Sequence, residues 1–363
     1  MAADTVFVVV VLLRFTVPLF IPKFPLPAVL AALVLDAADQ TIFQAFTDDP
    51  LEGYQSYDKA LDVYYLAIAY ISTMRTWRDP VAFQISRFLY LYRLVGVTLF
   101  ELLDQRWLLL VFPNTFEYFF IVYEAIRTRW NPMRMSATAL VGTAAFIWIV
   151  IKLPQEWWIH VAQLDFTEFM DDHPWAWGVI GGAALALGIA LWVNRRRIPS
   201  TDWPFTLAVD THLPPIEVAE PRKTFFDAIL LEKIVFLALV SVIFAQILPD
   251  VRSGNLGLAI GVGVLVVLNA AVSEWIYRRG HSWQNSFTEF LGMLVINLGI
   301  VFADSLLSPR RDAPTLETFF FVLLLSLLIA LYDRYRATRG TGDLRTPAIA
   351  AWRAERRRKE GIS

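Results

Sequence analysis

The sequence predicts an all-α, polytopic integral membrane protein of about eleven transmembrane helices, with its N-terminus outside and its C-terminus in the cytoplasm. The first observation is composition: of 363 residues, 56% are hydrophobic and 18% are charged, and the mean hydropathy is +0.50. A water-soluble core cannot bury that much apolar side chain. The second observation is that the apolar residues form long runs, and the third is that the loops between these runs differ in charge.

The apolar runs approach the roughly 20 residues that a helix needs to cross a bilayer core of about 30 Å. Membrane strands would alternate apolar and polar residues, whereas these runs are apolar on nearly all sides, so helix is the predicted state. The predicted spans are residues 5–21, 26–46, 59–76, 81–103, 107–126, 135–153, 175–194, 226–248, 255–276, 285–305 and 315–332.

Loop charges predict the orientation, because Lys and Arg are retained on the cytoplasmic side during insertion. Basic residues collect in alternate loops and in the tail, at Arg75 and Arg78, Arg127 to Arg134, Arg195 to Arg197, Arg278 and Arg279, and Arg334 to Lys359. Acidic residues collect in the other loops, at Asp48 to Glu52 and Asp165 to Asp172. We therefore expect a multi-pass protein of the cell membrane.

Proline divides the chain, because five prolines between 199 and 221 exclude a continuous helix there. The predicted parts are a seven-span module with buried carboxylates (1–194), a cytoplasmic connector (195–223), a four-span module (224–335) and a basic cytoplasmic tail (336–363). The predicted partners are the lipid bilayer, with anionic lipid at the tail, and no nucleic acid. The oligomeric state is left open. The absence of cysteine excludes disulfides, thiolate metal ligands and thiol nucleophiles.

Two pairs of aspartates are the strongest functional signal. Asp36 and Asp39 lie three residues apart in the second span, and Asp58 and Asp62 lie four apart at the start of the third, so each pair shares one helix face. A carboxylate at the bilayer centre costs at least about 2.5 kcal/mol, so such residues usually face the bundle interior. We expect the pairs to be neighbours in an outward-facing cluster that can ligate a divalent cation such as Mg²⁺ or Ca²⁺.

The alternative interpretation is that these carboxylates only neutralise buried arginines. Arg14, Arg87 and Arg93 also lie within predicted spans, and helix geometry allows an ion pair between Arg14 and Asp36. These arginines, together with Gln40 and Glu117, are the candidates for pairing with the aspartates or for lining a pathway.

Other polar residues of the spans have structural explanations. Asn114 and Glu117 have the spacing of a capping box at a helix start. Asn297 is typical of a hydrogen bond between helices. Several charged residues near span ends are expected to reach the membrane interface, namely Glu101, Glu124, Lys152, Glu232, Lys233, Glu274 and Asp304.

The aspartate pattern also carries a family resemblance, through Asp36, Asp39, Gly53, Asp58 and Asp62. It resembles the motif of the CDP-alcohol phosphotransferases and implies a two-metal site in which the four aspartates are ligands. The family motif has a glycine and then an Ala-Arg pair after its second aspartate. Those places here hold Gln40, Phe43 and Gln44. The resemblance is confined to residues 36–62, and that family binds its nucleotide donor on the cytoplasmic side.

Three functions follow as hypotheses. The first is a transport protein or channel for a cation or a small cationic solute, which enters through the carboxylate cluster. The second is a metal-dependent membrane enzyme that acts on a lipid-linked phosphate substrate. The third is a non-catalytic assembly subunit. The sequence leaves open whether the chain is an enzyme.

Overall fold

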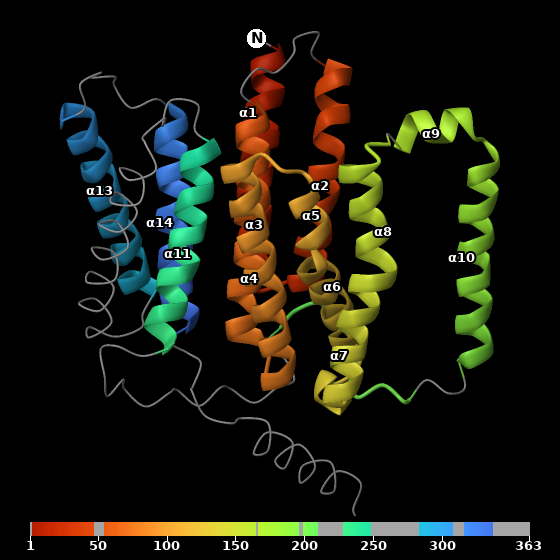
Figure 1. Ribbon diagram of the computed structural model, residues 1–363. Coiled ribbons are helices and arrows are strands. Elements are labelled where there is room, and N and C mark those ends of the chain that lie inside the picture. The colour runs from red at the N-terminus through yellow and green to blue at the C-terminus, as the bar shows by residue number, and fades with distance from the viewer. Residues whose placement is uncertain are drawn as a thin grey trace, which may run out of the picture.

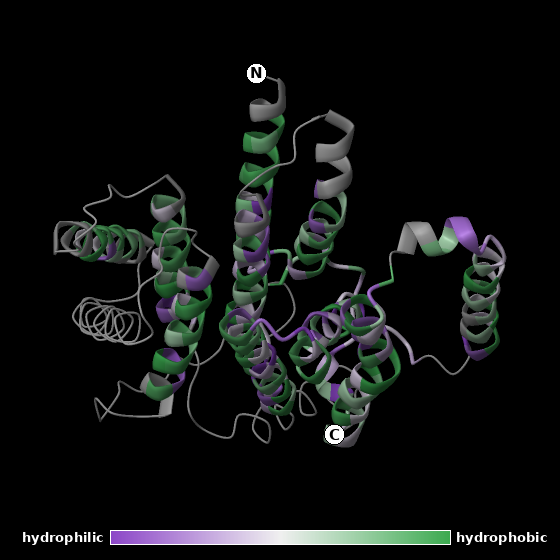
Figure 2. Ribbon diagram, turned by 45° about the horizontal axis from the view of Figure 1, so that its top comes forward, coloured by the Kyte–Doolittle hydropathy of each residue, from purple (hydrophilic) through white to green (hydrophobic). Residues whose placement is uncertain are grey.

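The computed structural model describes residues 2–46, 54–164, 166–195, 199–209, 228–247, 283–307 and 316–336. Every regular element within these ranges is helical, which confirms the all-α part of the predicted fold class. The long helices stand side by side as a bundle, and most of their length is apolar (Figures 1 and 2).

The chain order of the elements is as follows. The first half contains α1 (Ala2–Thr16), η1 (Val17–Phe20), α2 (Pro25–Phe46), α3 (Tyr54–Thr76), α4 (Pro80–Leu103), α5 (Trp107–Val111), α6 (Thr115–Arg127) and η2 (Pro132–Arg134). A long helix then combines α7 (Ala137–Phe146) and α8 (Leu153–Glu156) with two π-helical turns, η3 (Ile147–Lys152) and η4 (Trp157–Val161). The remaining elements are α9 (Phe166–Asp172), α10 (Trp175–Asn194), α11 (Ala228–Ile247), α13 (Trp283–Leu307) and α14 (Leu316–Arg336).

Four helical stretches in the described part of the chain are long and apolar enough to cross a membrane: Trp107–Arg127, Ala137–Val161, Trp175–Asn194 and Thr318–Tyr335. They support a helical membrane protein. Ten of the eleven predicted spans coincide with described helices, and the predicted span 255–276 lies outside the described residues. The count of eleven spans and the orientation stay predictions.

Helix α3 lies at the centre of the bundle, in contact with α1, α2, α4, α11 and α14. Tyr64 and Tyr70 of α3 and Trp77 directly after it are buried in the core: the ring of Tyr70 stacks on Tyr90 at 4.5 Å between centroids, and Trp77 stacks on Tyr123 at 3.9 Å. Because α3 has helices on several sides, many of its polar residues contact neighbouring segments, as Arg75 does at Pro22 and Tyr70 does at Glu232. This central position brings the aspartates at the start of α3 next to α1 and α2.

The membrane stretch Trp107–Arg127 is broken, because the chain leaves the helix between α5 and α6 at Phe112 to Asn114. Side chains satisfy the backbone groups that the break releases. Tyr92 donates its hydroxyl to the Val111 carbonyl (2.9 Å), and Arg93 donates Nη1 to the Phe112 carbonyl (3.0 Å). The backbone N–H of Asn114 donates to Oε1 of Glu156 (3.2 Å). Irregular backbone at membrane depth requires such partners.

Residues 199–209 of the connector are not helical, as its prolines predict. They lie against the turn after α6: Arg134 pairs with Asp202 at 3.0 Å, and the indole of Trp203 donates to the Arg127 carbonyl at 3.0 Å. Helix α10 follows α9 and precedes this connector in the chain, and it stands apart from the rest of the bundle (Figure 1). Most of its described side chains are exposed.

Several of the charges predicted to reach the membrane interface are instead buried, so that prediction was wrong. Glu124 is fully buried and accepts hydrogen bonds from the indole of Trp77 (2.7 Å) and from Arg127 (2.6 Å). Lys152 is also buried. Glu232 and Lys233 are buried in ion pairs that join α11 to α4 and α14. These charges have partners on neighbouring elements, so they do not need to reach water. The helix-to-helix hydrogen bond predicted for Asn297 is confirmed, because its Nδ2 donates to Ser326 at 2.9 Å.

Candidate functional site

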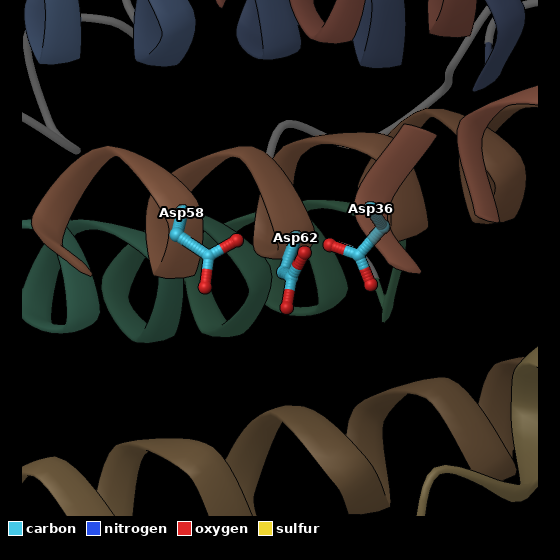
Figure 3. Close-up of side chains that lie close together, drawn as sticks. All are labelled: Asp36, Asp58 and Asp62. Carbon is cyan, nitrogen blue, oxygen red and sulfur yellow. The ribbon is translucent and has the colours of Figure 1, made fainter. Parts of the chain in front are cut away.

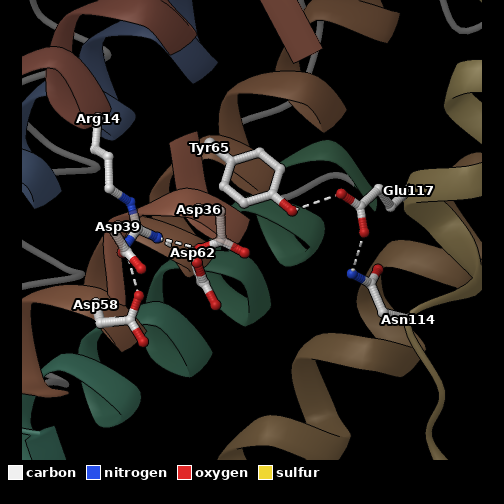
Figure 4. Close-up of polar contacts among 8 residues, drawn as sticks. All are labelled: Arg14, Asp36, Asp39, Asp58, Asp62, Tyr65, Asn114 and Glu117. Carbon is white, nitrogen blue, oxygen red and sulfur yellow. Dashed lines mark hydrogen bonds and ion pairs between the residues drawn. The ribbon is translucent and has the colours of Figure 1, made fainter. Parts of the chain in front are cut away.

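Three helices bring four aspartates and one arginine together (Figure 4). Helix α2 contributes Asp36 and Asp39, and α3 contributes Asp58 and Asp62. The three- and four-residue spacings place each pair on one helix face, and the two faces meet where α2 packs against α3. Arg14, in the last turn of α1, reaches into the space between them. The four aspartates and Arg14 are called the aspartate cluster below.

The guanidinium of Arg14 contacts all four carboxylates. Nη1 donates to Asp39 and, at 2.5 Å, to Asp58, while Nη2 donates to Asp36 and, at 2.6 Å, to Asp62. Arg14 is 4% exposed and Asp39 is 2% exposed. A planar guanidinium with five N–H groups can serve several carboxylates at once, which an ammonium cannot do with the same geometry.

The cluster has more negative than positive charge. Asp36, Asp58 and Asp62 have Arg14 as their one ion-pair partner within the described ranges, and Arg14 is also shared with Asp39. Three carboxylates and one guanidinium leave two negative charges if all are ionised (3 − 1 = 2), even before Asp39 is counted. Buried or half-buried charge of this kind is costly unless a cation or protons balance it.

The same three aspartates have the geometry of a cation site. One oxygen from each of Asp36, Asp58 and Asp62 lies within 4.8 Å of the others (Figure 3). Mg²⁺ and Ca²⁺ bind oxygen ligands at about 2.0–2.6 Å, so ligands on opposite sides of one ion are about 4–5 Å apart. The three side chains are 28%, 35% and 43% exposed, so an ion can reach them.

The other predicted pairing residues lie elsewhere. Arg87 pairs with Glu232 at 3.4 Å, and Arg93 binds the Phe112 carbonyl at the helix break. Neither arginine belongs to the aspartate cluster. Gln40 follows Asp39 in α2, but its side chain lies outside the described part of the structure. The pairing of these aspartates therefore depends on Arg14.

Glu117 lies in a separate buried network beside the cluster. The hydroxyl of Tyr65 donates to its Oε1 at 2.6 Å, and Nδ2 of Asn114 donates to its Oε2 at 2.9 Å. The capping-box interpretation was wrong, because the Asn114 side chain makes no capping bond to the helix backbone and instead binds the Glu117 carboxylate. Tyr65 follows Asp62 by one turn of α3, and its ring lies between the aspartates and Glu117 (Figure 4).

A third polar group was missed by the sequence reasoning. Glu156 pairs with Lys152 at 3.2 Å and lies 3.1 Å from Nε2 of His160. The residues are four apart, which is a recognisable signal for contact along a helix. The two π-helical turns around them were not predictable from that spacing. Because Glu156 also accepts the Asn114 N–H, this group holds the helix break in place.

The fold and the site together define a helical membrane protein with a carboxylate cluster where α1, α2 and α3 meet. No protein-family model, curated protein or solved structure matches the chain.

Proposed function

We propose that this protein transports a cation across the membrane and that Asp36, Asp39, Asp58 and Asp62 bind it. The observation that carries the proposal is that these four carboxylates share the single guanidinium of Arg14. A protein that only needed to stabilise its helices would gain more from equal numbers of acids and bases. The excess of carboxylate oxygens within one ion's coordination distance favours a cation as the missing positive charge.

Arg14 has a defined part in this mechanism. Its guanidinium contacts the oxygens that an incoming cation would bind, so the side chain acts as a tethered competitor for the cation. Binding then requires Arg14 to withdraw from part of the cluster, and release is favoured when Arg14 returns. A site that alternates between two positive partners avoids a permanently tight complex, which transport requires.

The proposed orientation places the N-terminus and the aspartate cluster on the outer side. It rests on the basic loops being cytoplasmic. The sequence between the two aspartate pairs also carries Asp48, Asp49 and Glu52, and acidic residues at an entrance raise the local cation concentration. The cation thus enters from the exterior and reaches Asp58 and Asp62 first.

The test is cation flux into liposomes that contain the purified full-length protein and an indicator dye. Mg²⁺, Ca²⁺ and K⁺ are assayed separately. We expect flux of at least one of them, and we expect Asp36→Asn and Asp62→Asn to abolish it while the protein still elutes as a folded species. Glu101→Gln is the matched control, because it removes a carboxylate that pairs with Lys59 outside the cluster. Flux that is unchanged in both aspartate variants contradicts the proposal, as does the absence of flux for all three ions.

A metal-dependent enzyme acting on a lipid-linked phosphate is the second candidate, and the 4.8 Å spacing of three aspartate oxygens favours it. It differs from transport in a measurable way. An enzyme binds Mg²⁺ or Mn²⁺ at the cluster and shows no flux, whereas the transporter shows both. The assembly-subunit hypothesis expected Asp36 to pair with Arg14 and the other acids to pair with Arg87 or Arg93. The first of these pairs is present, whereas Arg87 and Arg93 have other partners.

A further inference from the structure

Glu117 differs from the other buried glutamates. It is 5% exposed and is the middle residue of the membrane stretch Trp107–Arg127. Glu124, Glu156 and Glu232 each have a cationic partner, respectively Arg127, Lys152 and Arg87. Glu117 forms no ion pair within the described part of the chain. Its hydrogen-bond partners, Tyr65 and Asn114, are both neutral.

The nearby charged groups make their direct contacts elsewhere, although the positive charges of Arg93 and Lys152 still act on Glu117 at longer range. Arg93 of α4 binds the Phe112 carbonyl, Lys152 of η3 pairs with Glu156, and Asp36 of α2 pairs with Arg14. Of the remaining elements packed against α6, α7 has no titratable side chain, and Arg134 of η2 pairs with Asp202. On α6 itself, the Tyr118 hydroxyl donates to Gln155. Glu117 therefore lacks a fixed positive partner from any of these elements.

A carboxylate without a positive partner at the middle of a span is expensive, and the simplest compensation is a bound proton. We propose that Glu117 carries a proton that exchanges with the cation at the aspartate cluster, so that transport is coupled to proton movement. This inference rests on the proposed function and adds the coupling ion to it. When the cluster gains a cation, the Glu117 carboxylic acid loses its proton to water and becomes a carboxylate. When the cation leaves, the proton returns.

Tyr65 provides the link between the two sites. It lies on the same helix as Asp62, one turn further along, and its hydroxyl bonds directly to Glu117. Its ring lies between Glu117 and the aspartates (Figure 4). A change of charge at the cluster therefore changes the electrostatic environment of the Tyr65 hydroxyl, which donates a hydrogen bond to Glu117. Tyr65 is a positioning residue in this scheme, and Glu117 is the proton-binding residue.

The protonation of Glu117 can be tested separately from transport. Infrared difference spectra of the full-length protein in lipid nanodiscs report the C=O stretch of a protonated carboxylic acid. We expect such a band without added cation. Protonated aspartates of the cluster can add to it, so we expect Glu117→Gln to remove one component of the band and to leave the rest. Glu124→Gln is the matched control on the same helix and should retain the band, because Glu124 is ion-paired. A wild-type protein without a protonated-acid band, or a band that Glu117→Gln leaves unchanged, overturns the proposal.

The coupling is tested by proton release in weakly buffered solution when Ca²⁺ or Mg²⁺ is added to the same nanodiscs. Wild-type protein should release about one proton more per bound cation than Glu117→Gln does. For each unit rise in pH, the cation affinity of the wild type should therefore increase about tenfold more than that of Glu117→Gln. Tyr65→Phe should keep the infrared band and slow the exchange. Equal proton release in wild type and Glu117→Gln refutes the coupling. If aspartate substitutions leave flux unchanged while the infrared result holds, the proposed transport site fails and the protonated Glu117 stands.

Discussion

Replacing Arg14 with alanine removes the guanidinium that the four aspartates share, and it should destabilise the protein strongly. Charge-assisted hydrogen bonds contribute about 1.5–3 kcal/mol each, so four of them would add to about 6–12 kcal/mol. That sum is too large, because the abandoned carboxylates can take up protons. Removing one partner of a buried ion pair typically costs about 3–5 kcal/mol, and we expect a loss of that size.

The cation hypothesis predicts that this loss is reversible. If the aspartates bind a divalent cation, a concentration of about 100 times the dissociation constant stabilises the folded state by about 2.7 kcal/mol. Mg²⁺ or Ca²⁺ should therefore restore much of the stability of Arg14→Ala, and the variant should bind these ions more tightly than wild type because the tethered competitor is gone. The thirteen tryptophans make thermal unfolding in detergent measurable by intrinsic fluorescence.

Arg134→Ala is the control for this experiment, because it also breaks an Arg–Asp pair, with Asp202, but in the connector region. A pair nearer the surface contributes about 0–1 kcal/mol, so this variant should unfold near the wild-type temperature. Added Mg²⁺ or Ca²⁺ should change its unfolding temperature no more than that of the wild type. The reasoning is refuted if Arg14→Ala is as stable as wild type. It is equally refuted if Arg14→Ala is destabilised and no cation restores it.

Two further predictions test the helix break and the orientation. A Cβ added at Gly96 would lie 2.1 Å from Cβ of Phe112, so Gly96→Ala should displace the break and lower the unfolding temperature. Gly142→Ala is the control, because a Cβ added at Gly142 meets nothing within 4 Å, and it should leave the unfolding temperature unchanged. Single cysteines introduced at Arg129 and Asp171 of this cysteine-free chain should react with membrane-impermeant reagents from opposite sides, the first from the cytoplasm and the second from outside, and labelling of both from one side would contradict the proposed topology.

The helices were predictable because apolar runs of membrane length leave few alternatives. Local signals also marked some ends: Asp79 precedes Pro80 and accepts the N–H of Val81 at 2.8 Å, and Ser136 accepts the N–H of Ala139 at 3.1 Å. The proximity of the two aspartate pairs followed from helix periodicity and from the expected depth of the two spans. These features depend on residues near one another in the sequence.

The partners of the buried charges were not predictable in the same way. Arg14, Arg87 and Arg93 all lie within helices, and spacing along one helix does not say which neighbour its face will meet. The packing of α11 against α4 gives Arg87 its glutamate, and the break before α6 gives Arg93 a carbonyl. The break itself has only a weak signal in Pro113, because its stability depends on Tyr92, Arg93 and Glu156 arriving from two other helices.

The proposed cation site and Glu117 both contact helix α3. The aspartates come from two long helices and their positive partner comes from a third, so a cation that displaces Arg14 weakens the connection of α1 to α2 and α3. Glu117 lies in α6, the second half of the broken stretch Trp107–Arg127. Its hydrogen-bond donor Tyr65 lies in α3. Helix α3 therefore contacts both the site proposed to gain a cation and the residue proposed to lose a proton. Within the described residues, a cluster with more carboxylates than guanidinium groups and a glutamate without an ion pair therefore lie against the same central helix, where equal numbers of acids and bases would give more stability.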